Sequence, residues 1–571
     1  MQLDQLRHIF DDYRNMLPYA VLGVVAGACA AVILLCFEYV FTAPELWWRP
    51  AGETLDFELL PPWLRFTLPV TGALVLGLGF SLLKPGHREV GIMHVLSRMH
   101  SHYGHLPLAN AIVQFIGGAF ALATGQSGGR EGPGVHLGAA INSNLAHRLG
   151  LPNNSQRILI ACGTAGSIAA AFNTPLAGVI FAMEVIVTEY TVMGFMPVIL
   201  AAVSATTVSR IFSDSGAIFA IPGAQLVSLW ELPFILLLGV VAGAIVAGFI
   251  YLLKRMLGFG ATPILVRFGV AGLLTGLIAI EVPQVMGMGY DTLAQALAGE
   301  IALQLLLVII VCKLVATACS VGLGLPIGLI GPNLVIGGCL GAAMGAAGRL
   351  LFPELSSEPV LYVLIGMGAA MAAVLNAPLA AILAVVEFSE SISVVFPSML
   401  AIIAATLTRS SVFRQRSAHQ TVLVHLQRNI PEDPVSLLLH QTNVQTVMER
   451  DVLTIPPVLS GSDIDTVSQH PARWYLLQRD GEALYLIQGR SLADHLATVD
   501  GGDTVDLTEL DLRRWSVVGL RPRATLREAL DTLHEQTVEA LMIIGRGPGP
   551  DPNIRGVITR ESIDQFYLSK Y

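Results

Sequence analysis

Long stretches without a charged residue limit most strongly how this chain can fold. Each stretch is long enough to cross a hydrocarbon core of about 30 Å as a helix. Lipid cannot satisfy free backbone amide and carbonyl groups, so a helix is the structure expected for each. Several membrane spans are therefore predicted, beginning with these stretches: Tyr19–Phe37, Leu232–Leu253, Leu314–Gly348 and Pro359–Val386.

The charged residues gather toward the C-terminus. Of the 75 charged residues, 37 follow position 410, and the whole chain is 53% hydrophobic and only 13% charged. Such a composition does not describe a soluble enzyme, and it predicts a membrane part followed by a soluble tail. Residues 1–16 are expected to form an amphipathic helix before the first span, with no cleaved signal.

Several function classes find no support in the residues. The net charge of −9 and the lack of a Lys/Arg-rich run argue against nucleic-acid binding. All six cysteines fall in apolar segments without metal-type spacing, so they are interpreted as core residues and no metal site is predicted. No HExxH motif, nucleophile elbow or Cys/His set is present, and the chain is therefore not predicted to be an enzyme.

The membrane part contains an internal repeat. The sequence AFNTPLAGVIFAME at 171–184 matches VLNAPLAAILAVVE at 374–387, at an offset of 203 positions. Membrane repeats of this size are often related by inverted topology, with a substrate site near the midplane where the halves meet. The residues paired by the repeat are Asn173 with Asn376, Pro175 with Pro378, and Glu184 with Glu387.

Each half also carries a glycine- and proline-rich segment, over residues 123–138 and 320–338, in which GREGP (129–133) matches GLIGP (328–332). Such segments break helices, and broken helices at membrane depth are tolerated only where they are buried or line a cavity. Helices starting after both segments would direct free N–H groups at one point and form an anion site. Dipoles bind an anion weakly enough to release it. The alternative is that the glycines serve only close helix packing.

The carboxylate of Glu131, inside GGREGPG, is the most informative side chain, because intramembrane carboxylates are functional candidates. At a helix N-terminus it would compete with an anion for one place, and its protonation or displacement would open the path. The alternative is a simple pair with Arg130. Glu184 and Glu387, equivalent by the repeat, are expected to bond backbone groups as a scaffold. His136 is either a proton carrier or a hydrogen-bonded core residue.

GREGP, the duplicated AFNxPLA…E segment and GLGLPIGLIGP together resemble the CLC family of voltage-gated chloride channels and proton/chloride exchangers. The resemblance covers residues 17–425 and implies an all-α, multi-pass bundle of tilted and re-entrant helices in the lipid bilayer. It further implies two inverted halves, about 17–215 and 225–425, and a homodimer with one pore in each subunit.

The resemblance assigns roles to individual residues. Glu131 matches the gating glutamate of the family, and the backbone amides of Leu329 and Ile330 match those that hold the central chloride ion. Arg130 and Gly132 flank the outer site. Independently of the resemblance, a proton is expected to reach Glu131 through water or through His136, with Glu184 or Glu189 as alternative carriers.

The chain departs from the family pattern at four positions. Val90, in EVGIM, stands where a serine hydroxyl normally contacts chloride, Ile330 replaces an aromatic residue, and His419 is aligned with the inner tyrosine. Selectivity for chloride over another small anion is therefore open. Val185 stands where exchangers carry a second glutamate, which slightly favours a channel-like conductance, with proton-coupled antiport as the alternative. A receptor or scaffold without ion flux is the third interpretation.

The tail from residue 440 to 571, after a linker over 426–439, is expected to be soluble α/β. Its second unit predicts the order strand, helix, strand, strand, helix, and the tail resembles a CBS domain pair, which in the family lies in the cytoplasm. CBS pairs often bind adenine nucleotides through an acidic residue, but Ser562 stands at that position, with Asp564 displaced, which argues against a nucleotide. With the tail inside, a bacterial inner membrane is the expected location.

Overall fold

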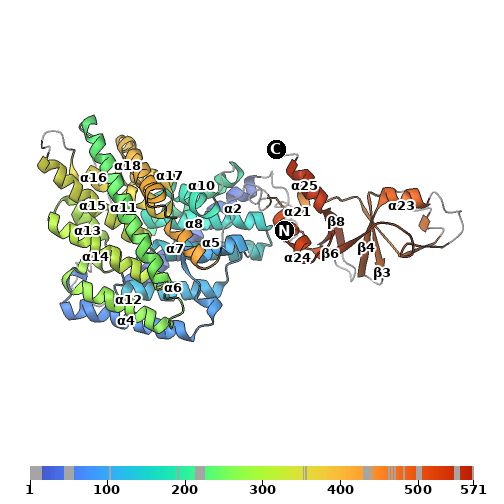
Figure 1. Ribbon diagram of the computed structural model, residues 1–571, viewed down its shortest axis with the longest axis horizontal. Coiled ribbons are helices and arrows are strands. Elements are labelled where there is room, and N and C mark those ends of the chain that lie inside the picture. The colour runs from blue at the N-terminus through green and yellow to red at the C-terminus, as the bar shows by residue number, and fades with distance from the viewer. Residues whose placement is uncertain are drawn as a thin grey trace. The chain divides into compact units, whose positions relative to one another are not determined.

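The computed structural model describes residues 16–43, 57–101, 104–188, 192–212, 225–351, 353, 357–428, 439, 442–460, 463–464, 467, 471–479, 482–496, 504–545 and 553–568. The helix expected over 1–16 lies outside these residues except for Met16. The chain divides into two compact units, residues 1–150 with 156–430, and residues 151–155 with 431–571 (Figure 1). The division at 430 falls inside the linker expected from the sequence.

The first half of the membrane unit is entirely helical among its described residues. Its α-helices are α2 (Met16–Thr42), α4 (Pro62–Leu82), α5 (Gly91–Ser101), α6 (Leu108–Ala123), α7 (Glu131–Leu149), α8 (Asn153–Phe172), α9 (Pro175–Phe181) and α10 (Val192–Phe212). Shorter elements are η1 (Phe57–Leu59), η2 (Pro85–Arg88) and the π-helical η3 (Ala182–Val187).

The second half repeats this all-helical plan. Its α-helices are α11 (Leu232–Leu257), α12 (Ile264–Glu281), α13 (Tyr290–Ala298), α14 (Leu303–Gly322), α15 (Ile330–Leu351), α16 (Pro359–Leu375), α17 (Pro378–Ser389), α18 (Val395–Leu407) and α19 (Ala418–His425). Shorter elements are η4 (Leu229–Glu231), η5 (Pro283–Val285), η6 (Ile392–Val394) and η7 (Thr408–Val412). The two halves also pack against each other, since α4 of the first half and α12 of the second lie side by side (Figure 1).

The described residues contain eight helices that are long and apolar enough to cross a membrane. This confirms the prediction of several spans. Two of the long charge-free stretches are not single helices, however. Leu314–Gly348 breaks between α14 and α15, and Pro359–Val386 breaks at Asn376 between α16 and α17. A stretch without charges limits where a span can lie, but glycine, proline and asparagine decide where its helix ends.

The two glycine-rich segments meet in an antiparallel bridge. The N–H of Gly129 donates to the carbonyl of Gly328 at 2.8 Å, and the N–H of Gly328 donates back to Gly129 at 2.8 Å. These two glycines are equivalent by the repeat. A pseudo-two-fold axis between the halves produces such a reciprocal, antiparallel contact between equivalent residues. The two halves are therefore inverted repeats.

The shared AFNxP and LNAP sequences form the same local structure in both halves. Asn173 and Asn376 end α8 and α16 with left-handed φ angles of 57° and 62°. Asparagine tolerates this conformation better than most residues. Pro175 and Pro378 then begin α9 and α17, where a missing N–H costs nothing.

The repeated glutamates cap each other's half. Glu387 accepts hydrogen bonds from the N–H groups of Leu176 and Ala177, at 2.9 and 2.8 Å, at the start of α9. Glu184 accepts from the N–H groups of Leu379 and Ala380, at 3.3 and 2.9 Å, at the start of α17. Each carboxylate thus satisfies free amides of the other half, as expected of a scaffold pair.

Replacing Glu387 by alanine is expected to destabilise the membrane unit by about 1–2 kcal/mol, because two amides at a helix start lose their acceptor. Glu184→Ala is expected to cost a similar amount, since its contacts are the mirror image. The measurement is heat-induced unfolding of the protein in detergent. Glu281→Ala, at an exposed helix end, is the control. Equal midpoints for all three variants would contradict the capping role.

The tail contains two units of similar build. The first consists of β1 (Val452–Ile455), β3 (Trp474–Arg479), β4 (Glu482–Gln488) and α23 (Gly489–Leu496). The second consists of β6 (Arg514–Leu520), α24 (Leu526–Glu535), β7 (Ala540–Gly545), β8 (Asn553–Thr559) and α25 (Arg560–Leu568), in the order predicted. In each, the first strand runs parallel to the second and the second antiparallel to the third.

One mixed sheet joins the two tail units, with strand order β1-β3-β4-β6-β7-β8. A short helix, α21 (Val444–Val447), precedes the sheet, and β2 (Val458–Leu459) pairs with β5 (Val505–Asp506). At the end of β8, Ser562 exchanges hydrogen bonds with Thr559, and Asp564 lies 3.9 Å from Arg560. Both side chains singled out by the sequence thus have local partners.

Candidate functional site

The N-termini of α7 and α15 meet at the centre of the membrane unit, where the glycine bridge joins the halves. Glu131 is the first residue of α7, and it is 1% exposed. Its Oε2 accepts a hydrogen bond from the N–H of Gly331, at 3.1 Å, in the first turn of α15. Two helix starts present partial positive charge to this point, so it favours any anion. The carboxylate of Glu131 occupies that place.

Glycine leaves the room that the carboxylate needs. A Cβ at Gly129 would overlap Glu131 Oε2, and a Cβ at Gly331 would lie 3.1 Å from Oε1. Elsewhere the glycines serve close packing, since a Cβ at Gly337 would overlap the carbonyl of Gly366. Both interpretations of the glycine segments therefore apply, at different positions.

A second donor to Glu131 comes from Tyr290, which the sequence did not single out. Its hydroxyl donates to Oε1, the oxygen that Gly331 does not bond. Tyr290 begins α13 directly after Gly289, which has a φ of 80°. Its ring packs near Phe172, with ring centres 6.3 Å apart. No motif or spacing in the sequence pointed to this tyrosine.

Lys313 fixes the loop that precedes Tyr290. Its buried ammonium donates to the carbonyls of four successive residues, at 2.9–3.4 Å: Gln284, Val285, Met286 and Gly287. Gln114 is its equivalent at the offset that aligns GREGP with GLIGP, and the Gln114 amide donates to the carbonyl of Pro326 at 2.8 Å. Each half thus uses one long polar side chain to hold a loop beside the site. The repeat offset could have pointed to both residues.

Arg130 does not pair with Glu131, contrary to the alternative interpretation. Its guanidinium bonds the carboxylate of Glu38 on α2 and donates to the carbonyl of Ala171 at 2.6 Å. It also lies over the ring of Tyr290, 6.0 Å from the ring centre. Arg130 therefore anchors the start of α7 to α2, and its charge is already balanced by Glu38.

A cavity of about 330 Å³ lies next to this site and is called the central cavity here. It is lined by four of the residues assigned to the anion by the resemblance, namely Val90, Gly132, Leu329 and His419. Arg130 and Ile330 are not among the lining residues. Tertiary packing thus brings residues as far apart as positions 90 and 419 to one cavity. Gly132, the residue directly after Glu131 in α7, lies in its wall.

Charge in the central cavity favours an anion. Its lining includes Arg88, Arg267 and Arg428 but a single carboxylate, Glu89. Glu89 forms a bidentate pair with Arg428, with N–O distances of 2.6 and 3.0 Å. Burial by itself raises the pKa of Glu89, but the hydrogen bond and charge of Arg428 bring this pKa below its usual range.

His419 is buried in the cavity wall, at 3% exposure. Within the part of the chain that the structure describes, its Nδ1 has no hydrogen-bond partner. A polar atom of this kind suits a bound water or anion.

Among the described residues, which do not include Glu189, the remaining candidates form no hydrogen bond with Glu131. Glu184 caps α17, as described above, and Val185 is buried in the π-helical turn η3. His136 is fully buried on α7 and contacts His94 of α5, which the sequence had not singled out.

Comparisons with known proteins agree with this geometry. Residues 71–410 match the family model described as voltage gated chloride channel. A ClcB-like chloride channel protein of Ralstonia nicotianae is 33% identical over 398 residues, covering 68% of this chain and 92% of that protein. An H(+)/Cl(−) exchange transporter ClcA of Vibrio parahaemolyticus is 29% identical over 445 residues, covering 73% of this chain and 92% of that protein.

Solved structures share the fold. A slow cyanobacterial Cl⁻/H⁺ antiporter matches with a TM-score of 0.64 and 24% identity, over 72% of this chain and 97% of its own. A eukaryotic CLC transporter matches with a TM-score of 0.57 and 18% identity, over 98% of both chains. The family model covers more than half of the chain, and the paired helix starts around Glu131 lie inside it. The chain therefore belongs to the CLC family of chloride channels and exchangers.

Proposed function

We propose that this protein is a proton-coupled chloride antiporter, in which Glu131 links the two ions. The observation that carries the proposal is the position of the Glu131 carboxylate, bonded by Gly331 and Tyr290 between two helix N-termini. A carboxylate there competes with an anion for the same donors. It can also bind a proton, which removes the competing charge and frees the place for chloride.

Two of the proteins compared above support exchange, whereas the Ralstonia relative is named a chloride channel protein. Of the relatives and structures compared above, the Vibrio protein is named an H(+)/Cl(−) exchange transporter and the cyanobacterial structure a Cl⁻/H⁺ antiporter. The sequence favoured a channel because Val185 cannot bind a proton where exchangers carry a second glutamate. Because of Val185, a chloride-selective channel is the second candidate function.

The test is flux from liposomes that hold the purified wild-type protein. Chloride and external pH are recorded together while a chloride gradient is imposed. We expect protons to move against the chloride flow in a fixed ratio, and a chloride gradient to drive protons uphill, because one carboxylate serves both ions. Chloride flux without any proton movement would leave the channel candidate. No flux of chloride, nitrate or fluoride would refute the anion pathway altogether.

The assembly and the tail belong to the same proposal. We expect a homodimer in a bacterial inner membrane, with one pathway in each subunit. The tail is expected to act as a cytoplasmic CBS pair without a bound nucleotide. Its two strand–strand–strand units and the local hydrogen bonds of Ser562 support this.

A further inference from the structure

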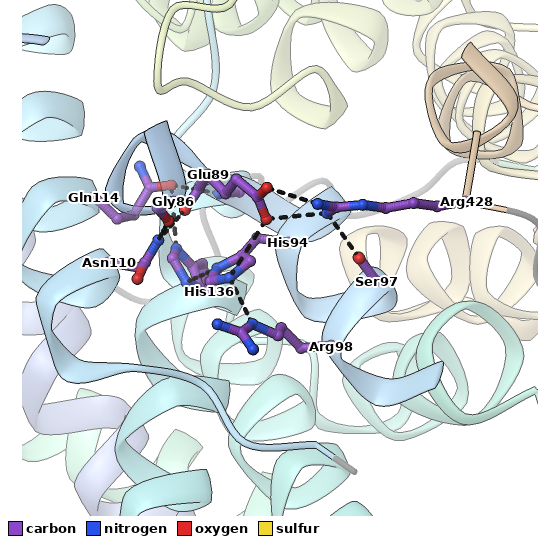
Figure 2. A network of polar contacts seen from close by, with 10 residues as sticks. Gly86, Glu89, His94, Ser97, Arg98, Asn110, Gln114, His136 and Arg428 are labelled. Atoms are coloured by element: carbon purple, nitrogen blue, oxygen red, sulfur yellow. Dashed lines mark hydrogen bonds and ion pairs between the residues drawn. The ribbon is translucent and has the colours of Figure 1, made fainter. Parts of the chain in front are cut away.

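Two buried histidines lie together between α5 and α7. Nδ1 of His94 is 3.0 Å from Nε2 of His136, and the rings meet edge to face with centres 5.0 Å apart (Figure 2). His94 is 2% exposed and His136 is fully buried. His94 also lines the central cavity. The pair therefore reaches from the central cavity into the core of the first half.

The neighbouring hydrogen bonds fix the protons of both rings. Nε–H of Arg98 donates to Nε2 of His94, at 3.2 Å, so a neutral His94 carries its proton on Nδ1. That proton points at Nε2 of His136. The remaining proton of His136 is then on Nδ1, 3.4 Å from Oε1 of Gln114. The two neutral rings thus share one bond along which a proton can pass.

One acidic group is placed to stabilise a protonated His94. Oε2 of Glu89 lies 4.0 Å from Nε2 of His94, the same ring nitrogen to which Arg98 donates (Figure 2). Glu89 in turn bonds Arg428, which also donates to Ser97. On protonation, His94 would lose the bond from Arg98 and gain Glu89.

Other charged and titratable groups lie on the elements around the pair. Helix α6, which packs on α7, has no charged residue and offers Asn110 and Gln114. On the elements around the pair, the described charged and titratable groups include His87, Arg88 and Glu89 at η2, Arg98 on α5, Glu38 on α2, Glu131, His147 and Arg148 on α7, and His419, His425 and Arg428 at α19.

We propose that the His94–His136 pair is the inner proton-exchange site of this protein. The proposal rests on the exchange proposed above. Cavity water gives a proton to Nε2 of His94 as the Nδ1 proton shifts to His136, so the pair gains one positive charge. In return, the shared proton moves back from Nε2 of His136 to Nδ1 of His94, and Nε2 of His94 releases its proton to cavity water beside Gly132, from which the carboxylate of Glu131 accepts it. Val185 leaves this chain without the usual inner carboxylate, and the pair supplies a titratable group in its place.

A second histidine pair, made by the loop after α5 and by α7, offers a matched control. His105 and His147 have ring centres 5.0 Å apart, and each lies eleven residues beyond His94 or His136. On α7, eleven residues return the helix to nearly the same face about 16 Å further along, whereas His105 lies in the loop after α5. Neither His105 nor His147 lines the central cavity.

The experiment compares wild type with His94→Gln, His136→Gln and His105→Gln in liposomes, recording chloride and proton movement together. A positioned proton-transfer group contributes roughly 10²–10⁴-fold, so we expect the proton-to-chloride ratio to fall about tenfold or more in the first two variants. Chloride flux should persist in both, which shows that they are folded. His105→Gln should keep the wild-type ratio.

Different results would overturn different conclusions. A wild-type ratio in both His94→Gln and His136→Gln would show that the pair only packs the core. An equal loss of coupling in His105→Gln would show that the effect does not depend on contact with the central cavity. A wild-type protein that moves chloride without protons would overturn the exchange itself and this inference with it. Should one variant fail to fold, the other still decides.

Discussion

Glutamine in place of Glu131 is expected to abolish proton movement while chloride still flows. The amide has nearly the same shape, but it cannot bind and release a proton. It also lacks the negative charge that holds the carboxylate at the starts of α7 and α15. A hydrogen bond to a charged group contributes about 1.5–3 kcal/mol, so the gate should leave this place roughly 10–150 times more readily. Chloride should then bind there correspondingly more often.

The measurement is chloride efflux with external pH recorded, for Glu131→Gln beside wild type. Glu300→Gln, at an exposed glutamate of the same unit, is the control and should behave like wild type. Proton transport that continues in Glu131→Gln at the wild-type ratio would show that another group couples the ions. Loss of both fluxes would show that the carboxylate is needed to keep the path intact.

Phenylalanine in place of Tyr290 is expected to weaken the hold on Glu131 and speed chloride transport. The ring keeps its packing near Phe172, while the hydroxyl that donates to Oε1 is lost. Losing one hydrogen bond to a charged group costs about 1.5–3 kcal/mol, so chloride should displace the carboxylate at a concentration lower by about tenfold or more. The measurement is the chloride dependence of flux.

Controls for Tyr290→Phe separate the gate from general effects of removing a hydroxyl. Tyr251 bonds Arg255 on the surface of α11, so Tyr251→Phe should leave transport unchanged. In the Glu131→Gln background, Tyr290→Phe should add little, because the two side chains act through one bond. Fully additive effects would mean that Tyr290 acts elsewhere.

Local sequence was enough to predict the features that depend on neighbouring residues. The glycine and proline segments predicted a helix start in each half, with Glu131 at one of them, and the structure begins α7 at Glu131 and α15 at Ile330. The repeat indicated one plan for both halves, and Asn173 and Asn376 each end a helix with a left-handed φ angle. Where a helix starts or ends depends on the backbone conformations that a few neighbouring residues allow. No contact with a distant part of the chain is needed to predict it.

The interpretation of Val185 shows the limit of a single position. Its side chain argued for a channel, because it cannot carry a proton. No sequence pattern indicated that His94, from another helix, bonds His136 and lines the central cavity. A proton path depends on which side chains meet in space, and one missing carboxylate does not exclude it.

The sequence by itself determined that this protein crosses the membrane several times, in two related halves, with a buried carboxylate at a helix start. The tertiary structure alone decided which groups bond that carboxylate, since Tyr290 and Gly331 lie 159 and 200 positions away. It likewise directed Arg130 to Glu38 and gathered Val90, Gly132, Leu329 and His419 around one cavity. Helix starts follow from local backbone chemistry, whereas partners across the bundle follow from how the two halves pack.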